Sequence, residues 1–191
     1  MNKLFLASKS PRRFEILKQA GFQFDIIDSS YEEELISKEF SYTKIETLAK
    51  NKAFGAVDNV SESGFILGAD TVVVYENNIL TKPKDYNDAF NMLKLLSGNT
   101  HSVVTSICIL DFKTKKFVTH STTTKVIFEQ LSTEMIDEYI KTYNPYDKAG
   151  AYGIQEMPSG YIKTVEGDIE NVIGLSSQAV KDTILKLETL L

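Results

Sequence analysis

Apolar runs separated by polar turns define the elements that the sequence predicts. The stretch FILGADTVVVY, at 65–75, is apolar enough for a central strand. Two further stretches, at 101–111 and 117–130, predict long antiparallel strands joined by a polar turn. The shorter predicted elements are strands at 4–7 and 22–28 and a tight hairpin turn at Asn77-Asn78.

Helices are predicted where a capping residue precedes apolar positions that recur at a spacing of three to four. The predicted helices are 12–20 after Ser10 and Pro11, a helix to about 57 that opens with the capping box Thr43 and Glu46, one through 96 after Asp85, one to about 142 from Ser132, and a last one from about 177. Loop-rich segments, including GDIENVIG at 167–174, separate them. Because helices and strands are mixed without strict alternation, we expect an α/β fold on a mixed sheet.

The overall charge narrows the classes of partner. The chain has 191 residues, which suits a single domain spanning 1–191, and 42% of them are hydrophobic. Its formal net charge is -5. A protein that binds nucleic acid generally carries a basic excess, so we expect no nucleic-acid partner. A small anion is still compatible with this charge, because the local charge sets the potential of a pocket.

Cysteine and histidine usage excludes two kinds of site. One cysteine, Cys108, cannot form an intramolecular disulfide, and its apolar surroundings predict a buried thiol. With His101 and His120 far apart, no zinc-binding spacing exists.

The apolar run at the N-terminus is too short for a signal peptide, and no stretch approaches the length of a membrane span. We therefore expect a cytoplasmic protein with no membrane partner.

The stretch LASKSPRRFEIL, at 6–17, combines two hydroxyls and three positive charges at the start of a helix. The helix dipole disfavours cations at that end, so an anionic ligand would offset the cost. A phosphate could be bound here by the free N–H groups of the first helical turn, by the hydroxyls of Ser8 and Ser10, and by the guanidinium groups of Arg12 and Arg13. The alternative is simple capping by Ser10 with both arginines in solvent.

Asp70 stands inside an otherwise apolar predicted strand. An ionised carboxylate is expensive to bury unless it is paired. A carboxylate that faces a cleft can bind a divalent metal or accept a proton from water. A structural pair with a buried lysine or with backbone donors explains it equally well. The acidic run 32–34 offers a second metal ligand or is a solvated loop.

Further polar residues fit the same chemistry. Lys52 lies on the inner side of its predicted helix, and Pro83 fixes a turn so that Lys82 projects from a strand end. The segment YDKAGAYGIQ, at 146–155, has small residues that let the backbone approach a ligand. Its Gln155 offers the donor and the acceptor that reading a base edge requires. A glycine-rich connection is the structural alternative for this segment.

Six blocks in order give the chain a resemblance to a known family. LASKSPRRFEIL, ADTVV, KP at 82–83, LSGNTHSVVT, YDKAGAYGIQ and NVIGL resemble those of Maf-like nucleotide pyrophosphatases, also called septum formation inhibitor homologues. The resemblance covers residues 4 to about 175. It implies the fold of inosine triphosphate pyrophosphatases: a bent mixed sheet with flanking helices and two lobes around a cleft. It also implies hydrolysis of a nucleoside triphosphate to the monophosphate and pyrophosphate.

The resemblance also implies roles for particular residues. Asp70 matches the catalytic acidic residue, and Glu33 best matches a conserved glutamate, so the two together would bind a divalent metal such as Mg²⁺ or Mn²⁺. The family's substrate-binding positions match Ser8, Arg13, Lys52 and Lys82.

Three specificity positions distinguish the branches of the family. Arg12, Thr71 and Gln155 match the branch that hydrolyses dTTP and UTP.

The family suggests a homodimer. Two alternatives stay open: a non-catalytic nucleotide-binding regulator of cell division, and a pyrophosphatase for non-standard purine nucleotides. Ser176 departs from the common pattern, in which Pro often follows GL.

Overall fold

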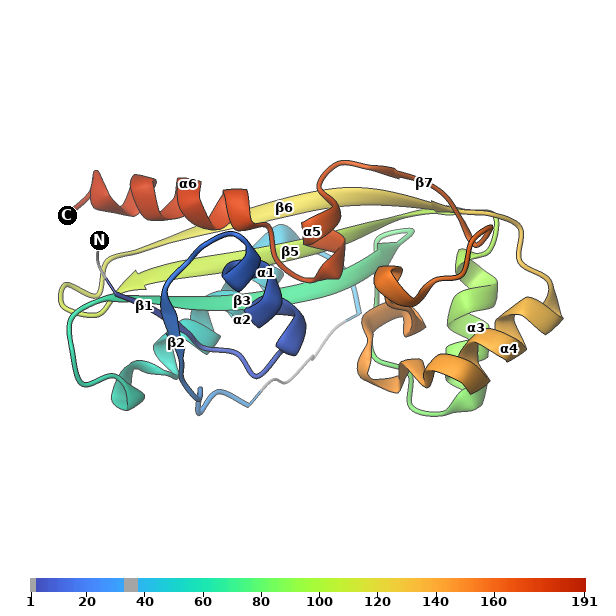
Figure 1. Ribbon diagram of the computed structural model, residues 1–191, viewed down its shortest axis with the longest axis horizontal. Helices are drawn as coiled ribbons and strands as arrows, with labels where there is room; N and C mark the ends of the chain where they lie inside the picture. Colours follow the sequence, from blue (N-terminus) through green and yellow to red (C-terminus); the bar gives the residue numbers. More distant parts are fainter. Residues whose placement is uncertain (1–2, 33–37) are drawn as a thin grey trace.

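The computed structural model describes residues 3–32 and 38–191, and it contains a mixed seven-stranded sheet flanked by helices (Figure 1). Three long strands dominate the sheet: β3 (Phe65–Tyr75), β5 (Thr100–Asp111) and β6 (Phe117–Phe128). The short strands are β1 (Leu4–Leu6), β2 (Phe24–Ile26), β4 (Asn78–Leu80) and β7 (Ile162–Glu166). The predicted α/β class with a mixed sheet is confirmed.

The strand order is β2-β1-β3-β5-β6-β7, and β4 pairs with β3. β1 runs parallel to both β2 and β3, whereas the other pairs are antiparallel. β1 and β4 use the same edge of β3, because β5 occupies the other edge along nearly the whole strand. This shared edge positions the candidate site.

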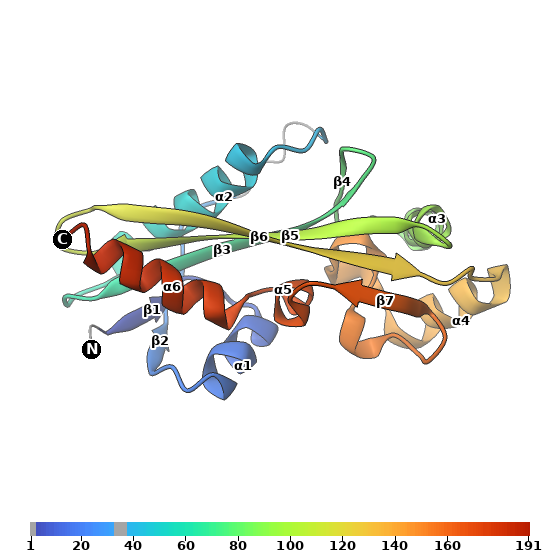
Figure 2. The same cartoon turned by 90° about the horizontal axis from the view of Figure 1, so that it is seen from above.

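The helices form two groups along the long strands. They are α1 (Pro11–Gln19), α2 (Tyr42–Phe54), α3 (Tyr86–Leu96), α4 (Thr133–Tyr143), α5 (Ile169–Ile173) and α6 (Ser177–Glu188). Figure 2 shows α2 on one face of the sheet and α1 and α6 on the other, whereas α3 and α4 lie at the far end of the strands. The long strands therefore connect two lobes, as predicted.

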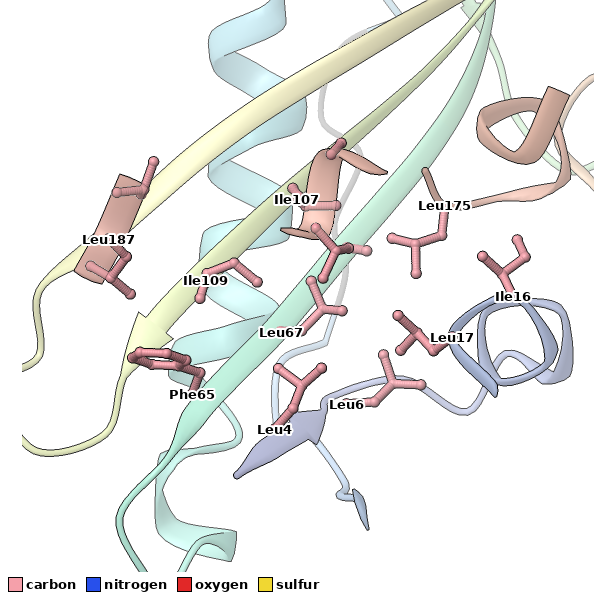
Figure 3. Close-up of a cluster of buried hydrophobic side chains, with 14 residues drawn as sticks. Leu4, Leu6, Ile16, Leu17, Phe65, Leu67, Ile107, Ile109, Leu175 and Leu187 are labelled. Carbon is pink, nitrogen blue, oxygen red and sulfur yellow. The ribbon is translucent and has the colours of Figure 1, made fainter. Parts of the chain in front are cut away.

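Each lobe has its own apolar core. In the first lobe, side chains from β1, α1, β3 and β5 meet on one face of the sheet, with Leu6, Leu17 and Leu67 fully buried (Figure 3). In the second lobe, Phe128 and Tyr139 lie within a separate cluster that joins β6 to α3 and α4. Burial of these apolar side chains holds each group of helices on the strands.

Most predicted helix starts are confirmed, because capping bonds are local. Asp85 accepts a hydrogen bond from the backbone N–H of Asp88, and Ser132 accepts one from that of Met135. The predicted capping box of Thr43 and Glu46 is wrong. Ser41 caps α2 instead, and Glu46 accepts a hydrogen bond from the Ser121 hydroxyl at 2.8 Å.

Two turn predictions need correction. The hairpin between β3 and β4 turns at Glu76 and Asn77, both with positive φ, one residue earlier than predicted. The segment 167–174, predicted as a turn, forms the short helix α5 with Asp168 as its cap.

Cys108 is buried as predicted, and burial raises the pKa of its thiol to about 12.

His101 gives the fold a specific acid sensitivity. It is 3% exposed, its Nε2 lies 2.7 Å from the Tyr152 hydroxyl, and burial lowers its pKa from 6.5 to about 4. Between these two values the unfolded chain binds the proton and the folded chain does not, so stability falls as pH decreases from 6.5 to 4. We expect this group to contribute a loss of about 3 kcal/mol across that range.

Urea unfolding at several pH values measures this loss. The slope of the unfolding free energy against pH should be flatter in His101→Gln than in the original protein. His120→Gln, which changes an exposed histidine on β6, is the control and should keep the original slope. An unchanged slope in His101→Gln would contradict the prediction.

Candidate active site

A cavity of about 540 Å³ lies beside an unpaired stretch of β3. β1 ends with Leu6 opposite Leu67, and β4 begins its pairing with Leu80 opposite Val73. Within the described residues, no strand pairs with positions 68–72 on that edge. Because successive strand residues face opposite sides of the sheet, this gap lets side chains from both faces reach one cavity.

The cavity walls come from both lobes. They include the start of α1, Lys52 on α2, the middle of β3, the loop that contains Lys82, the segment 147–156 and the end of α5. Five cationic side chains and three carboxylates line it among the described residues, so its formal charge is positive although the chain carries -5. A pocket of this kind favours a polyanionic ligand.

Asp70 and Lys52 form an ion pair at the cavity wall, in which the carboxylate is buried and the lysine side chain is 18% exposed. Asp70 is 4% exposed, and the Lys52 ammonium donates a hydrogen bond to its Oδ1. α2 approaches β3 closely enough for this contact because position 68 is glycine. A Cβ on Gly68 would overlap the Ala49 carbonyl oxygen and lie 2.6 Å from the Ala53 nitrogen. The lysine partner that the sequence left as a structural alternative is thus present, but it is only partly buried, and it lines the cavity.

Arg13 is held by segments that are far apart in the sequence. Its Nε donates to the Gly174 carbonyl at 3.0 Å, and its Nη1 and Nη2 donate to the hydroxyls of Ser8 and Thr71 at 3.2 and 3.1 Å. Ser8 contacts Arg13 in this way but is not one of the residues that line the cavity. The guanidinium is therefore fixed before any ligand arrives.

The Thr71 hydroxyl is engaged within the protein. It accepts a hydrogen bond from Arg13. It also lies 2.9 Å from the Thr105 hydroxyl and 3.2 Å from the Gly174 carbonyl oxygen. The Thr105 hydroxyl donates to the Asn171 carbonyl, so Thr71 supplies the hydrogen to Thr105 or Gly174. Its single hydrogen is used in either case, which leaves little capacity for contacts with a ligand.

The remaining predicted residues differ in how they are held. Lys82 is exposed and Gln155 is exposed, and neither makes an ion pair or side-chain hydrogen bond with the residues that the structure describes. Arg12 forms an ion pair with Asp147, with 3.3 Å between Arg12 Nη1 and Asp147 Oδ2. All three line the cavity. Glu33, the other predicted metal ligand, lies outside the described residues.

One ion-pair cluster at the cavity was not predicted, although two of its members, Asp147 and Lys148, belong to the segment YDKAGAYGIQ that the sequence indicated. Lys148 is 9% exposed and its Nζ lies 2.8 Å from Asp147 Oδ1 and 3.1 Å from Glu156 Oε2. The only signal in the sequence was the Asp-Lys pair inside the small-residue segment 146–155. Its partner Glu156 lies one residue beyond that segment and drew no attention.

The donor set fits a hard cation that is held partly by its substrate. No cluster of three or more His, Cys, Asp or Glu residues that could enclose a metal occurs within 3–32 and 38–191. Mg²⁺ in phosphate sites takes one or two carboxylates and completes its shell with phosphate oxygens and water. The Asp70 carboxylate in a cavity with room for phosphates fits this pattern.

No described helix combines the length and the apolar character that crossing a membrane would need. The fold and the cavity define a mixed α/β protein with a cationic cleft for a polyanionic ligand. The chain belongs to the Maf-like protein family, whose family model matches residues 3–187. The predicted family is confirmed.

Curated relatives cover nearly the whole chain. A dTTP/UTP pyrophosphatase of Clostridium novyi (strain NT) is 42% identical over 174 residues, which is 91% of each chain. One of Thermosipho africanus (strain TCF52B) is 43% identical over 182 residues, 95% of this chain and 92% of the relative. A solved nucleoside-triphosphatase / dITP/XTP pyrophosphatase from Mycobacterium abscessus is 13% identical with a TM-score of 0.47, over 98% of this chain and 95% of that one.

Proposed function

We propose that the protein hydrolyses nucleoside triphosphates to the monophosphate and pyrophosphate, with dTTP and UTP as preferred substrates. The observation that carries this proposal is the cationic cavity with the buried Asp70 carboxylate in its wall. The membership of the Maf-like family and the names of the curated relatives support the reaction and the bases.

The phosphate chain would lie against three cations. Arg13 presents a guanidinium that Ser8, Thr71 and Gly174 already orient, so binding need not order this side chain. Lys52 and Lys82 reach the same cavity from α2 and from the loop after β4. Positive groups held in place stabilise the charge that develops on the departing pyrophosphate.

A water molecule would attack the α-phosphorus, and Asp70 would accept the proton that this water releases. Lys52 orients its carboxylate through Oδ1. We propose that Asp70 and Glu33 hold a divalent metal, Mg²⁺ or Mn²⁺, which when bound would neutralise phosphate charge and favour ionisation of water. The remaining steps use side chains of this chain: Asp70 moves the proton, and the cations hold the phosphates.

The base would lie near Gln155 and Arg12. The exposed amide of Gln155 offers a donor and an acceptor, which match the edge of a uracil or thymine ring. A site built for these hydrogen bonds penalises a base that leaves them unpaired. Thr71 is the third proposed specificity position, and its bond to Arg13 links it to the phosphate side as well.

A panel of nucleotides with pyrophosphate detection tests the proposed function. With Mg²⁺ or Mn²⁺ present, we expect turnover of UTP and dTTP with kcat/KM at least about tenfold above that for CTP or ITP, because a site whose groups are arranged for the hydrogen bonds of uracil or thymine penalises a base that leaves them unpaired. Chelation of the metal should lower the rate. The product should be pyrophosphate, and not orthophosphate.

Two results would contradict the proposal. Nucleotide binding without turnover in the presence of metal would indicate a non-catalytic nucleotide sensor. A preference for ITP over UTP would indicate a pyrophosphatase for non-standard purine nucleotides. Equilibrium dialysis with UTP, run beside the kinetic panel, separates the first of these from a preparation that fails to bind nucleotide.

A further inference from the structure

Lys148 is a buried cation that the proposed reaction does not use. Lysine is rarely buried unless it is paired, because removing an ammonium from water is costly. Lys148 is 9% exposed. Its Nζ lies between two carboxylates, 2.8 Å from Asp147 Oδ1 and 3.1 Å from Glu156 Oε2. These partners stand at the two ends of the segment 147–156, so the ammonium connects the ends of that segment.

Gly153 makes room for the Lys148 side chain. A Cβ at position 153 would lie 2.8 Å from Lys148 Cε and 3.0 Å from its Cδ. Any larger residue would therefore displace the aliphatic stem. The Gly153 backbone N–H donates to the Tyr139 hydroxyl at 3.1 Å, which fixes this part of the segment against α4. The stem thus crosses the inside of the segment along a path that the fold keeps open.

The charges continue from this segment to α1. Asp147 Oδ2 lies 3.3 Å from Arg12 Nη1, so positive and negative groups alternate from Arg12 through Asp147 and Lys148 to Glu156. Burial alone would raise the pKa of Asp147, but the hydrogen bonds and charges of Lys148 and Arg12 outweigh it and lower the pKa. The carboxylate therefore stays ionised between its two partners at neutral pH.

Arg12 and Gln155 share a wall beside this cluster. Both line the main cavity and also a second hollow of about 230 Å³. Gln155 immediately precedes Glu156, and Arg12 contacts Asp147, so each of the two residues is joined to one carboxylate partner of Lys148. Among the described residues, no ion pair or hydrogen bond links Lys148 to Asp70, Lys52 or Lys82.

We propose that Lys148 is a positioning residue for base selectivity. Its ammonium joins Asp147 to Glu156, and this connection fixes the backbone that carries Gln155 relative to the Arg12 guanidinium. The inference deepens the proposed function and rests on it. Loss of the ammonium should loosen discrimination between bases while the phosphate-binding residues keep their places.

The test replaces Lys148 with methionine, which keeps an unbranched stem over Gly153 and removes the charge. We expect the ratio of kcat/KM for UTP to that for CTP to fall about tenfold, and kcat with UTP to change less than about threefold. Gly153→Ala, which pushes the stem aside while the ammonium remains, should lower the same ratio. Circular dichroism melting verifies that each variant is folded.

Lys141→Met is the matched control, because Lys141 forms an exposed ion pair with Asp137 on α4 in the same lobe. It should leave the ratio unchanged. A UTP to CTP ratio within twofold of the original in folded Lys148→Met, or an equal loss with both nucleotides, would overturn the inference and leave the proposed function standing. If Lys148→Met does not fold, Gly153→Ala decides between the same outcomes. An original protein that turns over neither UTP nor dTTP would overturn both.

Discussion

Asp70→Asn is expected to lower kcat/KM for UTP by at least about a thousandfold, because it removes both the proposed proton acceptor and a charged ligand for the metal. The amide is nearly the same size as the carboxylate, so the packing at this 4% exposed position should change little. Loss of the negative charge leaves the Lys52 ammonium facing a neutral group. Pyrophosphate release with UTP measures the rate, and the melting temperature reports on the fold.

Asp111→Asn is the control for this prediction. Asp111 is also largely buried, but it is the last residue of β5, where its Oδ2 accepts hydrogen bonds from the backbone N–H and the hydroxyl of Thr114, at 2.6 and 2.7 Å. Its replacement should cost stability of about 1 kcal/mol and leave kcat unchanged. Activity near that of the original protein in a folded Asp70→Asn variant would end the proposed role of Asp70.

Gly68→Ala is expected to lower the free energy of unfolding by about 3 kcal/mol or more, because overpacking against main-chain atoms cannot be relieved by a side-chain rotation. The added methyl group would overlap the Ala49 carbonyl and lie 2.6 Å from the Ala53 nitrogen, so α2 would have to move away from β3. Lys52 lies on the same turn of α2. Activity should therefore fall together with stability, as urea unfolding and UTP hydrolysis would measure.

Gly21→Ala separates packing from backbone strain. Gly21 has φ of +79°, which disfavours alanine, but no atom lies within 4 Å of the added Cβ. This substitution should cost about 1 kcal/mol and leave activity unchanged. If Gly68→Ala proves as stable as Gly21→Ala, the close contact between α2 and β3 is not what places Lys52.

Local chemistry explains which elements the sequence predicted well. A cap such as Asp85 bonds to a residue three positions later, so the pattern contains all the information that its geometry needs. The failure at Thr43 and Glu46 has a tertiary cause as well as a local one. Ser41 provides an equivalent hydroxyl two residues earlier, and Glu46 turns to Ser121 on β6, far away in the sequence.

Helix α5 was missed for a related reason. Five residues are too few for a helix that is stable alone, so the segment resembled a turn. The fully buried Asn171 donates from its amide to the Val103 carbonyl and to the Thr124 hydroxyl, at 2.9 and 3.0 Å. These bonds to β5 and β6 hold the helix against the sheet. They also place the Gly174 carbonyl where Arg13 binds it.

The sequence by itself determined the long strands, the capped helices, the family and the kinds of side chain available for polyphosphate chemistry, because these depend on short-range patterns and on residue type. Only the tertiary structure decided that Lys52 pairs with Asp70, that Arg13 is bound by Gly174 and that Lys148 bridges two carboxylates. The physical reason is that Coulomb and hydrogen-bond energies depend on distances between groups. Those distances are set by how β1 and β4 leave one stretch of the β3 edge open, and no local pattern encodes that.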